Sequence, residues 1–331
     1  MRSLTLLLTA FLLVGCYATE SSADSMLAQR PRLRQPGVRD NFPPHETIVV
    51  GGVAREYWLH RPVRGGGGKM PLVIALHGGE GHPLRFAQQT GFNDVADRNG
   101  FIVVYPSAGA RQWNDGRSTT AGGGDDVAFI RELIDHLVGT AGVDRARVYV
   151  TGTSNGGHMT LRLACELSDR IAAFAAVAGS FPTDYMRRCS PKHPVSVMLI
   201  HGSEDRFVRW QGGEIPRGRQ LGAGGAVEPV PGTVKFLAGH DGCRADPEVE
   251  KLPDRDPDDG TSVEVTRYED CRGGSEVVLV RIIGGGHAWP GARVTSSNRL
   301  TGRVSRELDG AAYVWNFFRG RSLADAGAAG K

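Results

Sequence analysis

Short apolar runs alternate with amphipathic stretches along most of the chain. The apolar runs predict buried strands at residues 71–76, 101–106, 147–151, 174–179, 195–200 and 277–283. The stretches between them predict helices at 84–98, 125–138, 155–168 and 232–240, and a last helix carries Ala312, Val314, Trp315 and Phe318. Strands that are buried on both faces and joined by helical crossovers form parallel sheets. The pattern therefore predicts an α/β fold, with a mostly parallel central sheet and helices on both faces.

The two ends of the chain lack this alternation. Residues 16–44 are polar and rich in Arg and Pro, and residues 320–331 are mostly small. Segments of this composition bury too little apolar surface to offset the entropy of ordering. We therefore expect one folded domain over residues 45–319, with a disordered tether before it and a flexible tail after it.

An apolar run at residues 4–15 follows Arg2. It is too short to cross a bilayer comfortably, and it has the length and the basic flank of a signal peptide. The residues LVGC, which end at Cys16, resemble the lipobox of bacterial lipoproteins, in which this cysteine is lipidated. We therefore predict a signal peptide at residues 1–15 and a membrane anchor on Cys16. The alternative is ordinary cleavage after Ala18, which would discard Cys16 and release a secreted protein; both interpretations predict export.

Composition and charge narrow the class of protein. Of 331 residues, 40% are hydrophobic and 23% are charged, which suffices for a sizeable core. The formal net charge is only +3, with no basic stripe or arm, so nucleic acid is not expected as a partner. The sequence makes no prediction of the oligomeric state.

Four cysteines lie within the predicted domain, at Cys165, Cys189, Cys243 and Cys271. An even set in an exported protein favours two disulfides over metal ligands or a nucleophile. Four cysteines allow three pairings. Sequential pairing would close two short loops, and each such crosslink would stabilise the fold by about 3 kcal/mol in the chain-entropy model.

The sequence GTSNGG lies between a predicted strand and a predicted helix. Gly152, Ser154 and Gly156 in it spell G-x-S-x-G, the nucleophile elbow of α/β-hydrolases. The turn of such an elbow is so sharp that the residues two before and two after the serine must be small. A plain structural turn is the alternative, and the case for a catalytic Ser154 depends on an acid and a base further along the chain.

The predicted acid is Asp205, a few residues beyond the strand at 195–200. That position places it at the same edge of the sheet as the elbow. Its neighbour Glu204 is a second choice. Asp125 and Asp126 precede a predicted helix, so helix N-capping explains them more simply.

The predicted base is His287, which follows the last predicted strand and three glycines. It comes after the serine and the acid, in the chain order that α/β-hydrolases use. The other histidines considered have simpler explanations, since they lie within helices, near the start of the domain or at a strand end: His45, His60, His136, His158 and His201.

An oxyanion hole is expected where the first predicted strand ends in a His-Gly-Gly sequence. There the N–H of Gly79 would face the elbow and, together with the N–H of Asn155, hold the oxyanion, at about 3–4 kcal/mol per donor. The alternative is a metal site made by His77, Glu80 and His82. Their spacing does not match the H-E-x-x-H pattern of zinc sites, so no metal and no cofactor are predicted.

Several co-linear motifs over residues 50–318 resemble the polyhydroxybutyrate depolymerase and feruloyl esterase group of secreted α/β-hydrolases. They are LHGG, QWNDGR, DDVAFI, GTSNGGHM, LIHGSED and GGGHAWPG. The resemblance implies an α/β-hydrolase fold, with Ser154 as nucleophile, Asp205 as acid and His287 as base. It also implies the disulfides Cys165–Cys189 and Cys243–Cys271, and it places Trp289 beside the substrate cleft.

Two departures from this group stand out. Gly79 replaces a cysteine that is frequent in the group, and residues 212–232 are longer and richer in glycine than usual.

These observations predict a secreted serine ester hydrolase that forms an acyl-enzyme and cleaves hydroxyalkanoate or related carboxylic esters. Because only a short tail follows residue 319, no separate module for holding solid polymer is expected, and a soluble or oligomeric ester is the expected substrate. We expect its acyl group to lie against Trp289 or, as a weaker candidate, Trp113; packing of both in the core is the alternative. The other candidate functions are a feruloyl or acetyl-xylan esterase, an acyltransferase and a non-catalytic surface lipoprotein.

Overall fold

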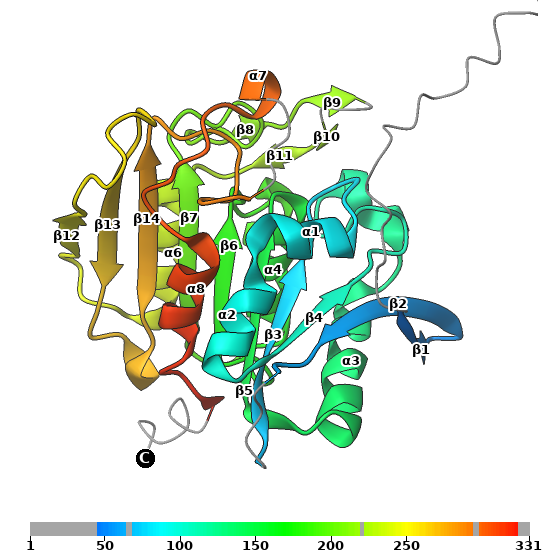
Figure 1. The fold of residues 1–331 in the computed structure, drawn as a ribbon. Coiled ribbons are helices and arrows are strands. Elements are labelled where there is room, and N and C mark those ends of the chain that lie inside the picture. Colours follow the sequence, from blue (N-terminus) through cyan, green and yellow to red (C-terminus); the bar gives the residue numbers. More distant parts are fainter. Residues whose placement is uncertain (1–44, 64–67, 219–221, 294–297, 324–331) are drawn as a thin grey trace, which may run out of the picture. The chain divides into compact units, whose positions relative to one another are not determined.

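The strands of the central sheet are apolar along most of their length. The computed structural model describes residues 45–63, 68–218, 222–293 and 298–323, and within them ten strands form one sheet. From edge to edge the strands are β1 (Glu46–Val50), β2 (Val53–His60), β4 (Ile102–Pro106), β3 (Met70–Leu76), β5 (Val143–Thr153), β6 (Ala173–Val177), β7 (Ser196–Gly202), β14 (Val277–Ile283), β13 (Ser262–Tyr268) and β12 (Glu248–Lys251) (Figure 1). Every residue of β4, β6 and β7 is buried, as expected for strands covered on both faces.

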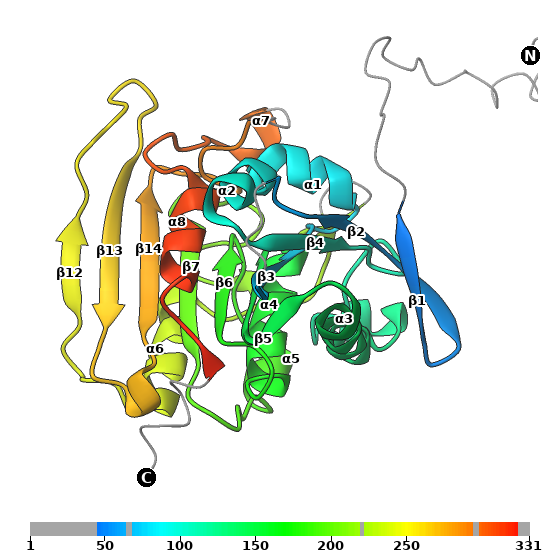
Figure 2. The ribbon, with the colours of Figure 1, turned by 60° about the horizontal axis from the view of Figure 1, so that its bottom comes forward.

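The parallel part of the sheet consists of the six strands that the apolar runs predict. These are β4, β3, β5, β6, β7 and β14, so the prediction of a mostly parallel sheet is confirmed. Antiparallel strands form both ends, with β1 and β2 beside β4, and β13 and β12 beside β14 (Figure 2). These four strands were not predicted from the sequence, because they lack a continuous apolar run. Every residue of β12, for example, is exposed.

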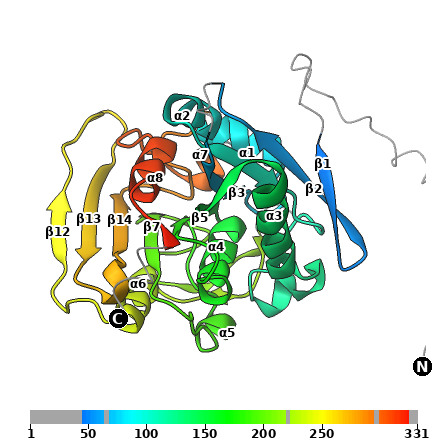
Figure 3. The same cartoon turned by 90° about the horizontal axis from the view of Figure 1, so that it is seen from below.

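Helices cover both faces of the sheet and bury two separate hydrophobic cores (Figure 3). One face carries α1 (Pro83–Thr90), α2 (Phe92–Asn99) and α8 (Gly310–Phe318), and the other carries α3 (Asp126–Thr140), α4 (Asn155–Glu166) and α6 (Val230–Asp241). The shorter helices are α5 (Thr183–Met186) and α7 (Asn298–Thr301), with 3-10 turns η1 (Ser118–Gly123) and η2 (Arg272–Gly274).

The helix predicted at 84–98 is two helices, because Gly91 interrupts it. Gly91 has φ 70°, a conformation that glycine adopts readily, and its N–H donates to Ala87 O at 3.0 Å to cap α1. The apolar period continues from α1 into α2, so the pattern alone indicates a single helix.

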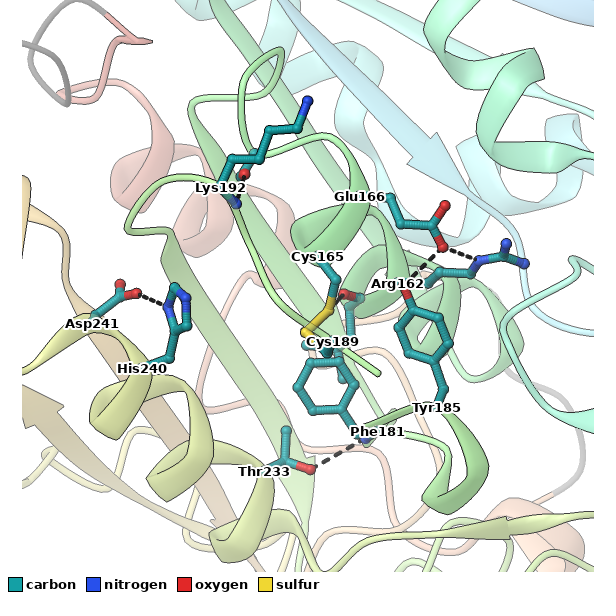
Figure 4. The surroundings of a disulfide bond; sticks show 12 residues. Arg162, Cys165, Glu166, Phe181, Tyr185, Cys189, Lys192, Thr233, His240 and Asp241 are labelled. Carbon is teal, nitrogen blue, oxygen red and sulfur yellow. Dashed lines mark hydrogen bonds and ion pairs between the residues drawn. A yellow bond between two sulfur atoms is a disulfide. The ribbon is translucent and has the colours of Figure 1, made fainter. Parts of the chain in front are cut away.

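Both disulfides implied by the resemblance are present, Cys165–Cys189 and Cys243–Cys271. Figure 4 shows the first, which links α4 to the segment after α5. Beside it, the Glu166 carboxylate accepts hydrogen bonds from Arg162 and from the Tyr185 hydroxyl, both at 2.8 Å. Disulfides form and persist in oxidising compartments, so the two bridges fit an exported protein.

The glycine-rich segment 212–232 forms two small antiparallel pairs. β8 (Gly213–Glu214) pairs with β11 (Ala226–Val227), and β9 (Arg217–Gly218) pairs with β10 (Gly222–Ala223). Figure 1 shows these strands above the carboxyl ends of β6 and β7, near α7. The segment therefore lies at the edge of the sheet where parallel strands place functional residues.

The predicted signal peptide, Cys16 and the tether up to residue 44 lie outside the described residues, as does the tail from residue 324. In the described part of the chain, none of the helices combines the length and the apolar composition needed to span a bilayer.

Candidate active site

Ser154 occupies the sharp turn between β5 and α4, which we call the elbow (residues 152–157). Its backbone has φ 55° and ψ −120°, and conformations of this kind cost a non-glycine residue about 1–3 kcal/mol. Two backbone hydrogen bonds hold the turn: Ser154 N–H donates to Val177 O, and His158 N–H donates to Ser154 O, both at 2.9 Å. The serine is therefore fixed at the carboxyl edge of the sheet, next to the N-terminus of α4.

The glycines of the elbow are required by close contacts with backbone atoms. A Cβ on Gly152 would lie 2.5 Å from Gly156 O, and a Cβ on Gly156 would lie 2.4 Å from Leu76 O. Neither oxygen can move aside easily, because Leu76 is paired with Gly152 between β3 and β5, and Gly156 belongs to α4. The requirement for small residues on both sides of Ser154 therefore holds in the folded chain.

His287 and Asp205 form a hydrogen-bonded pair, in which Asp205 is buried and the His287 side chain is 15% exposed. His287 Nδ1 lies 2.7 Å from Asp205 Oδ2, while Asp205 Oδ1 accepts from the N–H groups of Phe207 (2.8 Å) and Val208 (2.9 Å). Burial opposes ionisation of Asp205, but the charge of His287 and its hydrogen bond outweigh burial and lower the pKa of Asp205. Because an ionised carboxylate only accepts hydrogen bonds, Nδ1 carries the proton and Nε2 is left as the basic nitrogen.

A cavity of about 680 Å³ brings the predicted residues together. Ser154, His287, Gly79 and Asn155 all line it. Gly78 lies directly against the serine, since a Cβ on Gly78 would be 3.5 Å from Ser154 Cβ. The His-Gly-Gly loop, the elbow and His287 thus line one cavity, and Asp205 is hydrogen-bonded to His287.

Comparisons with known proteins agree with this arrangement. A family model described as Esterase PHB depolymerase matches residues 56–205. NocK of Nocardia uniformis subsp. tsuyamanensis, named as an esterase, is 31% identical over 314 residues, which cover 91% of this chain and 90% of that protein. The chain belongs to the Esterase PHB depolymerase family. It is accordingly a carboxylic ester hydrolase of the serine type.

Two further comparisons, one with a relative in sequence and one with a solved structure, agree with this family. Feruloyl esterase B of Piromyces equi is 30% identical over 226 residues, which cover 66% of this chain and 39% of that protein. The solved structure of an acetyl xylan esterase from Aspergillus awamori has a TM-score of 0.54 at 17% sequence identity, covering 74% of this chain and 94% of that one. The second comparison shows the shared α/β-hydrolase fold.

In this member of the family, the carboxylates weighed against Asp205 have other partners. The Glu204 side chain is 62% exposed and pairs with Arg303 at 3.2 Å. Asp125 caps α3 by accepting from Ala128 N–H at 2.9 Å, as predicted. Asp126 is not a cap: it is buried and forms an ion pair with Arg55 at 2.6 Å.

A buried polar network behind the elbow was missed by the sequence analysis. The Asn155 side chain donates to Asp115 Oδ2 (2.6 Å) and accepts from Trp113 N–H (2.7 Å). Asp115 also accepts from Arg117 Nη2 at 2.6 Å, and Arg117 Nη1 donates to Gly224 O at 2.6 Å. Burial opposes the charge on Asp115, but Arg117 outweighs it and lowers the pKa of Asp115. The network connects the elbow to the segment 212–232.

The signal for this network was the motif QWNDGR, which supplies Trp113, Asp115 and Arg117. The motif contributed to the family resemblance but did not indicate a contact with Asn155. Asp115 lies 40 positions from Asn155, and no sequence pattern links the two residues.

The two tryptophans expected to touch the substrate lie in the core. Trp289 is only 1% exposed and packs edge-on against Phe86 and Phe92, with ring centroids 5.6 and 5.7 Å apart. Trp113 is fully buried, and its Nε1–H donates to His77 O at 2.9 Å. Neither is among the described residues that line the cavity. The predicted substrate contact is therefore wrong, and the alternative of core packing holds because burial of a large apolar ring stabilises the fold.

The histidines of the His-Gly-Gly loop have structural roles. His77 is buried, accepts from Ala108 N–H at Nε2 (3.2 Å) and donates from Nδ1 to Gly78 O (2.7 Å). Burial lowers the pKa of His77 to about 4, against the opposing effect of the Gly78 hydrogen bond. His82 caps α1 by accepting from Leu84 N–H at 3.3 Å. Within the described ranges, no group of His, Cys, Asp or Glu side chains is arranged to hold a metal ion.

His201, which the sequence analysis interpreted as a satisfied buried residue, lies next to the acid. Its Nε2 is 2.7 Å from Val208 O and 3.4 Å from Asp205 Oδ2. Burial lowers the pKa of His201, so its ring is neutral at pH 7 and adds no charge beside Asp205.

Proposed function

We propose that Ser154, His287 and Asp205 are the catalytic triad of this esterase. The observation that carries the proposal is the 2.7 Å bond between His287 and Asp205, together with the cavity that Ser154 and His287 share. His287 Nε2 takes the proton of Ser154 Oγ as the oxygen attacks the ester carbonyl. Asp205 holds the Nδ1–H tautomer and stabilises the imidazolium that forms.

The N–H groups of Gly79 and Asn155 hold the oxyanion of the tetrahedral intermediate, and each donor contributes about 3–4 kcal/mol. The intermediate then expels the alcohol, which takes the proton from His287, and leaves an acyl group on Ser154. Water, deprotonated by His287, attacks the acyl-enzyme and releases the acid. The buried network from Asn155 to Arg117 supports this role, since it fixes the residue that supplies one donor.

The proposed substrate is a soluble or oligomeric ester of a hydroxyalkanoate or a related carboxylic acid. The family description and the size of the cavity support it, since about 680 Å³ accommodates a small ester. A feruloyl or acetyl-xylan ester is the second candidate, favoured by the identity to Feruloyl esterase B.

The test compares wild type and Ser154→Ala on 3-hydroxybutyrate oligomers, methyl ferulate and acetylated xylo-oligosaccharides. Wild type should cleave the hydroxybutyrate oligomers fastest, and Ser154→Ala should lower kcat by a factor of about 10⁶ with an unchanged circular dichroism spectrum. Near-normal turnover in the variant would refute the nucleophile, whereas faster cleavage of ferulate or acetyl-xylan would select the second candidate.

We further propose that residues 1–15 are a signal peptide, that Cys16 carries a lipid and that residues 16–44 tether the domain 45–319, followed by a flexible tail at 320–331. The motif LVGC supports the anchor. Mass spectrometry of the mature N-terminus tests it: a lipidated Cys16 is expected, and an unmodified N-terminus at Thr19 would show ordinary secretion.

A further inference from the structure

The segment 212–232 forms part of the wall of the cavity. Ile215, Arg217, Gly218 and Ala223 line the same space as Ser154 and His287. In the sequence this segment stands out by its unusual length and glycine content, neither of which indicates a role.

The charges that line the cavity do not cancel. Of its Lys, Arg, Asp and Glu side chains, one is acidic and two are basic: Glu80, Arg117 and Arg217. Arg117 is buried and its charge is balanced by Asp115 at 2.6 Å. Glu80 is balanced by Arg111 at 3.1 Å. Arg217 forms no ion pair with any described carboxylate, so it is the unbalanced charge of the cavity.

Arg217 also has a backbone that is held in position, through its pairing with Ala223. It is exposed, yet its side chain runs along Gly224: a Cβ on Gly224 would lie 3.3 Å from the Cβ and the Cδ of Arg217. The carbonyl of Gly224 in turn accepts from Arg117 Nη1 at 2.6 Å and from Thr119 Oγ1 at 3.3 Å. The buried network behind the elbow therefore fixes the backbone on which Arg217 lies.

Apolar groups line the rest of the same wall. Phe207, Val208 and Ile215 face the cavity, and Val208 and Ile215 pack with Val227 in a small core of their own. A ligand that satisfies both features has a short hydrocarbon part and an anionic group within reach of a guanidinium, which binds carboxylates through two parallel hydrogen bonds.

We propose that Arg217 binds a carboxylate of the substrate, so that the preferred ester is a short hydroxy-acid oligomer with a free carboxyl end. The inference rests on the proposed function and narrows its substrate class. Cleavage of such a dimer adds water across the ester bond, and the departing alcohol is a hydroxy acid that carries the carboxylate. A neutral acyl-sugar offers Arg217 no anionic partner.

The test measures kcat/KM for the linear dimer of 3-hydroxybutyrate and for the primary amide of the same dimer, which has nearly the same shape without the charge. Wild type should prefer the carboxylate by about tenfold or more, and the preference should shrink as salt is added. Arg217→Gln should lower kcat/KM for the carboxylate about tenfold and leave the amide within about twofold.

Arg98→Gln is the matched control. Arg98 is exposed near the end of α2, just before β4 begins at the opposite edge of the sheet, and the same change of charge there should alter neither substrate. Equal losses on both dimers in Arg217→Gln, or no preference in wild type, would overturn the inference. If the enzyme cleaved other esters but neither dimer, the inference about Arg217 would be wrong and the proposed triad would stand. If it cleaved no ester at all, the proposed function itself would be wrong.

Discussion

The elbow and the described residues of the segment 212–232 line one cavity, but they are held in place in different ways. The elbow joins β5 to α4 and packs against β3. Its backbone lies so close to β3 that a Cβ added to Gly156 would be 2.4 Å from Leu76 O, and this close packing keeps the strained Ser154 in position. The described residues of 212–229 include four two-residue strands, β8 to β11, and Ile215 and Val227 among them pack with Val208 in a small separate core.

The difference in packing matches two different requirements, one for the chemical step and one for the choice of substrate. Attack on a carbonyl needs a nucleophile, base and oxyanion donors held to within a fraction of an ångström, which buried and over-determined backbone supplies. Selection among esters needs a surface that can vary without disturbing the fold, and exposed segments supply that. We therefore expect changes at the elbow to abolish turnover for every ester, and changes at 212–232 to alter the choice of ester.

After Ser154→Ala, the largest expected effect is that of changing Asp205, the proposed acid. Asp205→Asn should lower kcat by about 10⁴ for all esters, because an amide favours the wrong tautomer of His287. Glu204→Gln is the matched control one position earlier, where an exposed pair with Arg303 contributes less than about 1 kcal/mol. Steady-state kinetics on one neutral ester measure both, and a large loss in Glu204→Gln would show that the acid has been misassigned.

The sequence carried more signal for the elbow than for the segment 212–232. Ser154, Asp205 and His287 could be proposed from the sequence because each follows a long apolar strand, and such strands are visible as continuous runs. The edge strands β1, β2, β12 and β13 were missed because partly exposed strands lack those runs.

Trp289 shows a second limit of sequence reasoning. A tryptophan two residues after the predicted base has the same local sequence whether it faces the cleft or the core, and only its packing against Phe86 and Phe92 distinguishes the two. The pairing of Asp115 with Asn155 is likewise a tertiary contact that no local period encodes.

A second prediction concerns acid sensitivity, which we expect to arise beside the elbow. Burial lowers the pKa of His77 to about 4, while an unfolded histidine titrates near 6.5. Between these pH values the unfolded chain binds a proton that the folded chain does not, so the free energy of unfolding falls as the pH falls. The loss attributable to His77 is on the order of 3 kcal/mol between pH 6.5 and 4.

Urea unfolding across this pH range should therefore show a shallower pH dependence in His77→Gln than in wild type. His193→Gln is the control, since His193 is exposed and the same change there should leave the slope unaltered. An identical slope in wild type and His77→Gln would contradict the assignment of the acid-sensitive group.

The smallest expected effect is a difference of about 2 kcal/mol between the same substitution made at one glycine on each side of the cavity. Gly156→Ala places a Cβ 2.4 Å from Leu76 O and should destabilise the fold by about 3 kcal/mol, because paired backbone cannot move aside without strain. Gly224→Ala meets only the flexible side chain of Arg217, at 3.3 Å, and should cost about 1 kcal/mol, mainly for its φ of 78°. Gly139→Ala is the control within α3, where nothing lies within 4 Å of an added Cβ and alanine should stabilise the helix by about 0.5–1 kcal/mol.

Urea unfolding gives all three values, and the kinetics should divide in the same way: Gly156→Ala loses turnover on every ester, whereas Gly224→Ala shifts only the ratio between charged and neutral dimers. Equal destabilisation by Gly156→Ala and Gly224→Ala would mean that both walls are equally rigid, and the division between chemistry and selection would then have no basis in the packing.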